Sequence, residues 1–232
     1  MKKNAQTQLD QRRTFLKQIA TGAAVLGTGI LAAPLALAAE TTTTYSDSDA
    51  DEWFKGVKGA HKIVFDVTGP NGLMPFAWPR VFTLTNAATG TPEKDCGVVV
   101  ILRHNAIPYA LNNQLWAKYK FGEMFKIYEE DGKTPATKNP FWQPAPGTYK
   151  VPGIGPVQIG INELQDTGIK FCACSMAITV FSAVTAMQTK QEADAVKKEW
   201  MAGLLPGVPA MPSGVWAVGR AQEHGCAYCF AG

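Results

Sequence analysis

The chain has 232 residues, 46% of them hydrophobic, and a formal net charge of +3, which is typical of one globular domain and excludes a disordered or fibrous protein. Residues 1–39 hold five basic residues and one acidic residue, a net of +4, so residues 40–232 carry −1. The positive charge is therefore local, and we expect no nucleic-acid binding, which needs clustered Lys and Arg.

Residues 1–39 have the organisation of an export signal. A polar, basic stretch precedes an apolar run at residues 19–37, which is rich in Ala and Gly. The A-L-A triplet that ends at Ala38 fits an A-x-A cleavage site. We expect cleavage near Ala38 and no membrane span afterwards, because no later apolar run reaches the roughly 18 residues that a bilayer requires.

The stretch Q-R-R-T-F-L-K at residues 11–17 resembles the twin-arginine export signature through Arg12 and Arg13 and the apolar pair after them. Gln11 stands where Ser or Thr is commoner. The resemblance implies a protein that folds in the bacterial cytoplasm and works in the periplasm. A single uncleaved membrane anchor is the alternative, which the Gly-containing apolar run and the cleavage site disfavour.

The remaining chain divides into a linker and a domain. Residues 40–56 contain four consecutive threonines and an acidic run, with too little apolar content to fold, and predict a flexible acidic linker. The domain is expected at 57–232. Strands are predicted at 61–67, 96–102, 169–173, 208–211 and 226–230, and helices at 78–88, 107–119, 157–165, 175–187, 192–201 and 215–224.

The alternation of strands and helices predicts the fold class. The runs at 61–67 and 96–102 are nearly continuous in apolar residues, which suits strands covered on both faces. Five successive strand–helix units give an α/β domain with a parallel sheet of about five strands. Residues 122–155 lack periodicity and predict an inserted loop, which is a functional lid, a structural elaboration or a subunit contact.

Cys174 is the residue with the clearest chemical use. It lies where the strand at 169–173 meets the following helix, and the N–H groups and dipole of a helix start favour a solvent-reachable thiolate. Ser175 can add a hydroxyl donor or a cap. Cys172 would be the nearby second thiol, half-buried inside the strand, and it shares a strand face with Cys174 if the strand runs that far. The alternative is that these cysteines pack as small hydrophobic residues.

Other candidates follow the same edge of the sheet, where parallel α/β folds bind ligands. His104 and Asn105 leave the second strand, and Cys229 lies near the end of the last. His104 could stabilise a thiolate or transfer a proton near neutral pH, or it could merely cap or pack.

Cys226 and Cys229 form a C-x-x-C motif in the last predicted strand. Residues three apart in a strand point to opposite faces, with Cα atoms roughly 10 Å apart, too far for a disulfide. We therefore expect separate roles for the two, unless the strand is broken there. The five cysteines leave at least one thiol unpaired or paired between chains.

A metal or cofactor site is an alternative hypothesis. Cys172, Cys174, Cys229 and His224 could supply soft ligands, but their spacing matches no strong zinc motif, so no cofactor is predicted. A non-catalytic structural or partner-binding subunit is a further alternative.

Three stretches together resemble the DsrE/DsrF/TusD-like sulfur-transfer family: V-V-V-I-L-R-H-N-A at 98–106, G-I-K-F-C-A-C at 168–174, and the closing run with L-L-P-G-V, P-S-G-V and R-A-Q between 204 and 222. The resemblance covers about residues 60–232, except 122–155. It implies a flavodoxin-like three-layer domain that forms trimers or hexamers.

The resemblance also implies a function. A cysteine at the Cys174 position would carry a persulfide, or form a mixed disulfide, between a sulfur donor and an acceptor, each a protein or a small thiol. Export, Cys172, the C-x-x-C motif and the loop at 122–155 depart from the family pattern. A periplasmic protein cannot serve the cytoplasmic tRNA machinery, so that acceptor role is not carried over, and whether the protein is an enzyme stays open.

Overall fold

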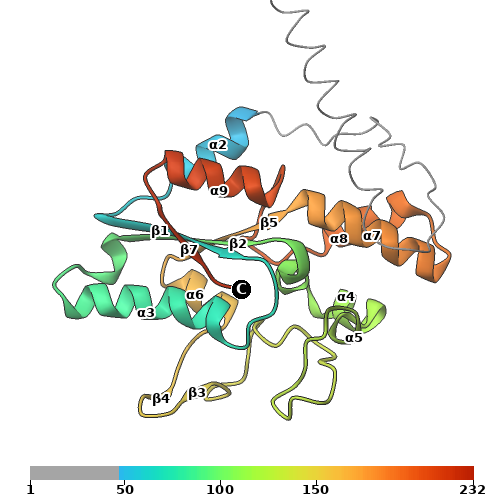
Figure 1. Ribbon diagram of the computed structural model, residues 1–232, viewed down its shortest axis with the longest axis horizontal. Coiled ribbons are helices and arrows are strands. Elements are labelled where there is room, and N and C mark those ends of the chain that lie inside the picture. Colours follow the sequence, from blue (N-terminus) through green and yellow to red (C-terminus); the bar gives the residue numbers. More distant parts are fainter. Residues whose placement is uncertain (1–46) are drawn as a thin grey trace, which may run out of the picture. The chain divides into compact units, whose positions relative to one another are not determined.

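A computed structural model describes residues 47–232, and the predicted signal peptide, with Arg12, Arg13 and Ala38, lies outside them. The centre is a five-stranded sheet in the order β6-β5-β2-β1-β7, with every neighbouring pair parallel (Figure 1). Its strands are β1 (His61–Val67), β2 (Cys96–Leu102), β5 (Lys170–Cys174), β6 (Ala210–Met211) and β7 (Ala227–Phe230). A separate antiparallel pair joins β3 (Lys150–Val151) to β4 (Gly155–Pro156).

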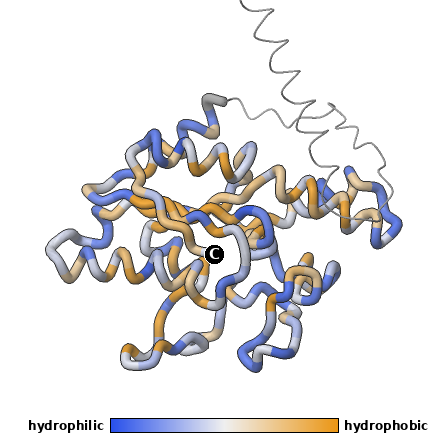
Figure 2. The backbone as a smooth tube through the Cα atoms, viewed as in Figure 1, coloured by the Kyte–Doolittle hydropathy of each residue, from blue (hydrophilic) through white to orange (hydrophobic). Residues whose placement is uncertain are grey.

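The two strands with the most continuous apolar sequences lie inside the sheet. β1 and β2 have the predicted bounds and pair along their full length, from His61 opposite Cys96 to Val67 opposite Leu102. Six consecutive residues of β2 are buried, as expected for a strand covered on both faces. The central strands accordingly form the most hydrophobic part of the chain trace (Figure 2).

Helices cover both faces of this sheet. They are α2 (Asp47–Lys55), α3 (Met74–Ala88), α4 (Asn113–Tyr119), α5 (Phe121–Phe125), α6 (Ile161–Asp166), α7 (Ser175–Thr189), α8 (Ala193–Ala202) and α9 (Gly214–Glu223), with 3-10 turns η1 (Glu93–Asp95) and η2 (His104–Ala110). In the described part of the chain no helix is both long and apolar enough to cross a membrane.

Two buried clusters fill the space between the layers. The α9-side cluster lies between the sheet and α2 and α9, and its members include Phe54, Val64, Val99, Ile101, Cys172, Ala217 and Cys226. The larger α7-side cluster covers the opposite face, and its members include Phe65, Phe76, Val100, Trp116, Phe171, Ile178 and Trp200. The three-layer, flavodoxin-like α/β prediction is confirmed.

The chain direction explains this division. From β1 through β2 and β5 to β6 the sheet grows in one direction, so right-handed crossovers place the connecting helices on one face. The chain then returns to the far side of β1 to form β7, and the connecting helix α9 lies on the other face. The strand order therefore reverses between β1 and β7.

Three predicted helices begin at clearly different residues, and one of them, α6, begins at Ile161, four residues later than predicted. The segment predicted as one helix at 107–119 is a 3-10 turn followed by α4, because Asn112 caps α4 by accepting a hydrogen bond from the Leu115 N–H at 3.1 Å. α3 begins at Met74, four residues earlier than predicted, because Pro75 lies in its first turn, where a missing N–H costs nothing.

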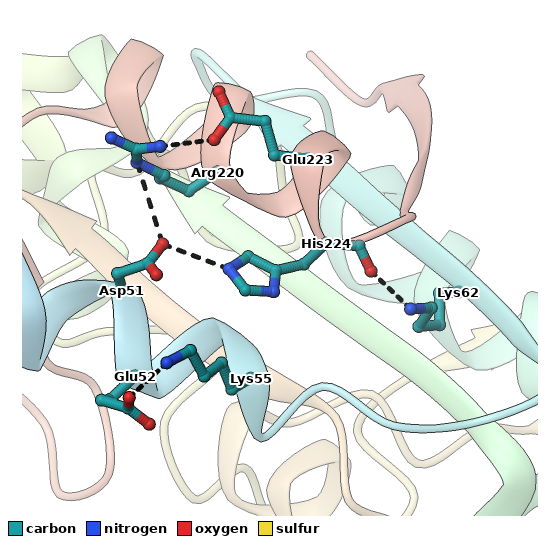
Figure 3. Close-up of polar contacts among 7 residues, drawn as sticks. All are labelled: Asp51, Glu52, Lys55, Lys62, Arg220, Glu223 and His224. Carbon is teal, nitrogen blue, oxygen red and sulfur yellow. Dashed lines mark hydrogen bonds and ion pairs between the residues drawn. The ribbon is translucent and has the colours of Figure 1, made fainter.

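The prediction of a flexible linker throughout 40–56 is wrong for residues 47–55, which form α2. Phe54 is 0% exposed and edge-packs against Trp216 of α9. Figure 3 shows Asp51 of α2 facing Arg220 and His224, with its carboxylate 3.1 Å from His224 Nε2. Phe54 and the buried Ala50 thus anchor a helix whose sequence is otherwise mostly polar.

The inserted segment 122–155 packs on the domain. Phe141 stacks on Phe76 of α3 and on Tyr149. The buried Asn139 amide donates hydrogen bonds to the carbonyls of Tyr109 and Leu111, at 2.8 and 3.1 Å. The segment is therefore a folded elaboration of the α7 side, with its own buried contacts.

Candidate active site at the carboxyl edge of the sheet

Cys174 ends β5 and caps α7. Its Sγ accepts a hydrogen bond from the Ala177 N–H at 3.3 Å, the role that an oxygen-bearing side chain usually plays at a helix start. The 15 residues of α7 present their dipole and free N–H groups at this sulfur. Cys174 is 6% exposed, less than the solvent-reachable thiol that the sequence predicted.

Ser175 follows as the first residue of α7. Its Oγ is buried and has no hydrogen-bond partner among the residues described. Buried hydroxyls normally have a partner, so an unpaired one beside the candidate thiol leaves a donor for a group that enters the site.

A polar network crosses the same edge of the sheet on three adjacent strands. Arg103, directly after β2, donates from Nε and Nη2 to the two carboxylate oxygens of Asp66 at 2.6 and 2.8 Å. Tyr228 of β7 donates its hydroxyl to Asp66 Oδ2 at 2.9 Å. Asp66 is 2% exposed, and these bonds satisfy a carboxylate that would otherwise be costly to bury.

The strand register brings the backbone of Arg103 next to that of Cys174, while the side-chain bonds of the network extend away from β5, to β1 and β7. Leu102 pairs with Ala173, so the next residues, Arg103 and Cys174, lie beside each other at the ends of β2 and β5. On the other side, Cys174 pairs with Met211, just before Ser213 caps α9.

Cys172 has a different environment from Cys174. It is 0% exposed and belongs to the α9-side cluster, whereas Cys174 belongs to the α7-side cluster. β5 does run to Cys174, yet the two thiols lie in different clusters, because the chain turns into α7 at Cys174. The expectation of a half-buried Cys172 is wrong, since the side chain is fully enclosed. Burial raises the pKa of the Cys172 thiol, and the Cys174 charge adds to the rise. Cys172 is thus a neutral core residue.

His104 and Asn105 reach the predicted edge, and both are exposed. His104 adopts φ = +50°, a left-handed conformation that costs energy for a non-glycine residue. Its ring makes an edge contact with Phe181 of α7, with centroids 6.1 Å apart. Asn105 lies beside Gly69 in the loop after β1. The described contacts support a packing role for His104 and place neither side chain on Cys174.

Cys226 and Cys229 are separated as predicted. Cys226 is buried in the α9-side cluster, whereas Cys229 packs on the α7-side cluster. Both are free thiols whose pKa values are raised, mainly by burial. The motif therefore spans the sheet and forms no redox pair.

Residues 47–232 contain no group of three or more His, Cys, Asp or Glu side chains arranged for a metal ion. His224, the suggested histidine ligand, hydrogen-bonds Asp51 instead (Figure 3). The proposed ligand set of Cys172, Cys174, Cys229 and His224 is thus not brought together.

The crevice where open α/β sheets most often bind ligands, between β1 and β7, is filled by the chain itself. Thr68 N donates to the Gly232 carbonyl at 2.9 Å, and Ala231 N donates to the Asp66 carbonyl at 2.9 Å. Ala231 is fully buried. The candidate reactive groups that remain at this edge, Arg103, Cys174 and Ser175, lie at the ends of β2 and β5.

The sequence reasoning missed Asp66, Arg103 and Tyr228. One signal was present, since Asp66 interrupts the apolar run Ile63–Val67 and a carboxylate inside a buried strand needs a partner. That partner follows the neighbouring strand, 37 residues later.

Comparison with known proteins adds little. No family model matches the chain, and no curated protein matches it. One solved structure, of a protein of unknown function from Methanobacterium thermoautotrophicum, aligns with 73% of this chain and 98% of its own at 16% identity and a TM-score of 0.35. A likeness this distant carries no argument about function.

Proposed function

We propose that this protein is a periplasmic sulfur carrier that holds sulfane sulfur as a persulfide on Cys174, or a mixed disulfide at the same sulfur. The observation that supports the proposal is the placement of Cys174 at the carboxyl edge of the sheet, where its Sγ caps the N-terminus of α7. A helix start stabilises negative charge on sulfur, and the thiolate is the form that attacks another sulfur atom.

The transfer step involves no net oxidation. The Cys174 thiolate attacks the outer sulfur of a donor persulfide, R–S–SH. A new S–S bond forms at Cys174, the S–S bond of the donor breaks, and the donor leaves as the thiolate R–S⁻. An acceptor thiolate then attacks the outer sulfur on Cys174 in the same way and restores the Cys174 thiolate.

The surroundings suit a small donor. Cys174 is only 6% exposed, so a narrow group such as a low-molecular-weight persulfide reaches its sulfur more easily than a globular surface does. The unpaired Ser175 hydroxyl offers a hydrogen bond to the added sulfur.

Incubation with glutathione persulfide, followed by peptide mass spectrometry, tests the proposal. We expect the Cys174 peptide to gain one sulfur atom and the Cys174→Ser variant to lose this reaction. Cys96→Ala is the matched control, because Cys96 is a half-buried thiol at the opposite edge of the sheet. If Cys174 gains no more sulfur than Cys96, the thiols are structural and the carrier proposal fails.

The proposed location follows from residues 1–39. We expect export by the twin-arginine route and cleavage near Ala38. Replacing Arg12 and Arg13 by lysine should hold the precursor in the cytoplasm, and normal export of that variant would contradict this route.

The proposed assembly is a homo-oligomer, a trimer or hexamer as the family resemblance implies. α7 has no charged residue, and Met176, Val180, Val184 and Met187 form an exposed apolar row along it. A second copy of this chain would cover that row. Sedimentation as a monomer at micromolar concentration would contradict the proposal.

A further inference from the structure

The two edge strands of the five-stranded sheet differ in how they are protected. β6 has two residues, Ala210 and Met211, and both are buried. β7 has four residues, of which Tyr228 is 47% and Phe230 is 55% exposed, and no described strand pairs with its outer side. Edge strands usually carry a charge or a proline that prevents pairing with another chain, and β7 has neither.

The main-chain groups on the outer side of β7 belong to Tyr228 and Phe230. The Ala231 N–H donates to the Asp66 carbonyl of β1 at 2.9 Å. Along an extended strand, alternate residues direct their N–H and C=O groups to opposite sides, so Cys229 also faces β1, and Tyr228 and Phe230 face outward. Another extended strand is the partner that satisfies such a row of groups.

One flank of α3 extends this edge with apolar side chains. Phe82 edge-packs on Phe65 of β1, with ring centroids 6.5 Å apart. Trp78 and Met74 lie one and two turns earlier on the same side of the helix, and they are 37% and 38% exposed. The only charged residue of α3, Arg80, is paired with Glu93.

We propose that a second copy of this chain pairs with β7 in the antiparallel direction, about a two-fold axis at Cys229, and joins the two sheets into one. Tyr228 of each copy then lies opposite Phe230 of the other, and the outward N–H and C=O groups of the two residues bond each other. The facing aromatic rings add a favourable cross-strand contact. The interface is separate from the α7 row, which begins at the end of β5, and it does not depend on the chemistry of Cys174.

The absence of charge on β7 favours a second copy as the occupant. A two-fold axis through a short strand brings each charge on that strand close to its own copy, which is unfavourable, and β7 has no charge to repel. The axis is perpendicular to the sheet, so the two α3 helices lie on the same face, one on each side of the new strand pair.

The size of the surface sets the expected affinity. Aromatic side chains bury about 150–250 Å² each, so the exposed parts of Tyr228, Phe230 and Trp78 present about 300 Å² per copy. Two copies, with Met74 and the main-chain edge added, approach the lower limit of a specific interface, about 1,200 Å² in total. We therefore expect a dimer that dissociates in the micromolar range.

The same register supplies a reporter of the pairing. Cys229 lies opposite Cys229 of the second copy in a non-hydrogen-bonded pair, with Cα atoms about 4.5 Å apart. This separation is within the range that a disulfide accepts, about 4.4–6.8 Å. Cys229 is a free, half-buried thiol, whereas Cys226, just before the strand, is buried against the other face of the sheet.

Oxidative crosslinking of the purified protein tests the proposal. Copper–phenanthroline catalyses the reaction, in which oxygen accepts the two electrons and two protons that the thiols lose as the Sγ–Sγ bond forms. Non-reducing electrophoresis and peptide mass spectrometry should show a covalent dimer linked through Cys229. Cys229→Ser should abolish this dimer, and Cys96→Ser, which removes the other half-buried thiol, should retain it.

A pair of charge variants tests the partner and the register together. Phe230→Lys and Phe230→Glu each place like charges about 7–8 Å apart across the two strands. Each variant alone should crosslink about tenfold less than the wild type, and an equal mixture should recover the Cys229 crosslink because the charges then attract. Both should fold, since Phe230 is half-exposed. Ile154→Lys is the matched control, because it adds the same charge at an exposed apolar residue between β3 and β4.

Three results would overturn the proposal: no crosslink through Cys229, equal crosslinking of Phe230→Lys and the wild type, or no recovery in the mixture. Amide hydrogen exchange gives a measurement that needs no thiol chemistry. The peptide of residues 227–231 should exchange more slowly as the protein concentration rises, and exchange that is independent of concentration would also overturn the pairing. An oligomer that forms without either signal would assemble through another surface, such as the α7 row.

Discussion

Cys172 and Cys174 are two residues apart on one strand and have opposite surroundings. Cys172 is fully enclosed by the apolar α9-side cluster. Cys174 ends the strand, caps a 15-residue helix and lies beside Arg103. Residue type therefore says little about reactivity here, and the distance along the strand from its carboxyl end decides which thiol meets polar groups.

The largest expected difference between the two positions comes from adding a charge. Cys172→Asp buries a carboxylate without a partner and should cost on the order of 3–5 kcal/mol of unfolding free energy. Cys174→Asp places the carboxylate at a helix N-cap beside Arg103 and should change stability by about 1 kcal/mol or less. Urea unfolding measures both, and equal losses would contradict the comparison.

A smaller effect is expected from crowding Arg103. Gly214→Ala places a Cβ 2.6 Å from Arg103 Cβ and Cδ, so it should cost about 1–3 kcal/mol of unfolding free energy. Gly219→Ala is the matched control on the same helix, since its Cβ meets nothing within 4 Å. Gly219→Ala should stabilise the protein by about 0.5–1 kcal/mol. If Gly214→Ala left the unfolding free energy unchanged, the Arg103 side chain would not be held tightly.

The smallest effect concerns alkaline pH. The pKa of Cys172 is raised in the folded protein, chiefly by burial, so the unfolded chain loses this proton first. Stability is therefore fully present below about pH 9, the ordinary cysteine value, and falls as the pH rises above it. Cys172→Ala should cost about 1 kcal/mol at pH 7 through lost packing. Above pH 9, the unfolding free energy of Cys172→Ala should fall less steeply with pH than that of the wild type, by up to about 1.4 kcal/mol per pH unit. The unfolding free energies of the wild type and Cys172→Ala, measured from pH 7 to 10, would contradict the prediction if they changed in parallel.

The sequence predicted the layers of this fold better than its site. The apolar runs of β1 and β2 could be read directly, because strands buried on both faces have no other pattern. The junction at Cys174 was also readable, since β5 and α7 are adjacent in the chain. α2 was not, because its sequence is mostly polar and the partners of Phe54 and Asp51 lie in α9, more than 150 residues later.

The charge network at the site could not be read locally. Asp66 bonds Arg103 across 37 residues and Tyr228 across 162 residues. Only the strand order places β7 beside β1, and that order depends on the return of the chain through α9. Cys172 was misjudged for a related reason, since which cluster a strand residue faces depends on where the next helix starts.

The same pairing of β1 with β7 has a consequence for the order of folding. The chain between β1 and β7 forms a loop of about 160 residues, since Val64 pairs with Tyr228. Closing this loop has an entropic cost that the contacts repay only after its ends have met. β7 has four residues and pairs with β1 alone, so it offers few contacts to nucleate the fold. We expect β7 to dock after the transition state, on a preformed sheet of the inner strands. A Tyr228→Phe variant should then unfold faster while refolding at nearly the wild-type rate.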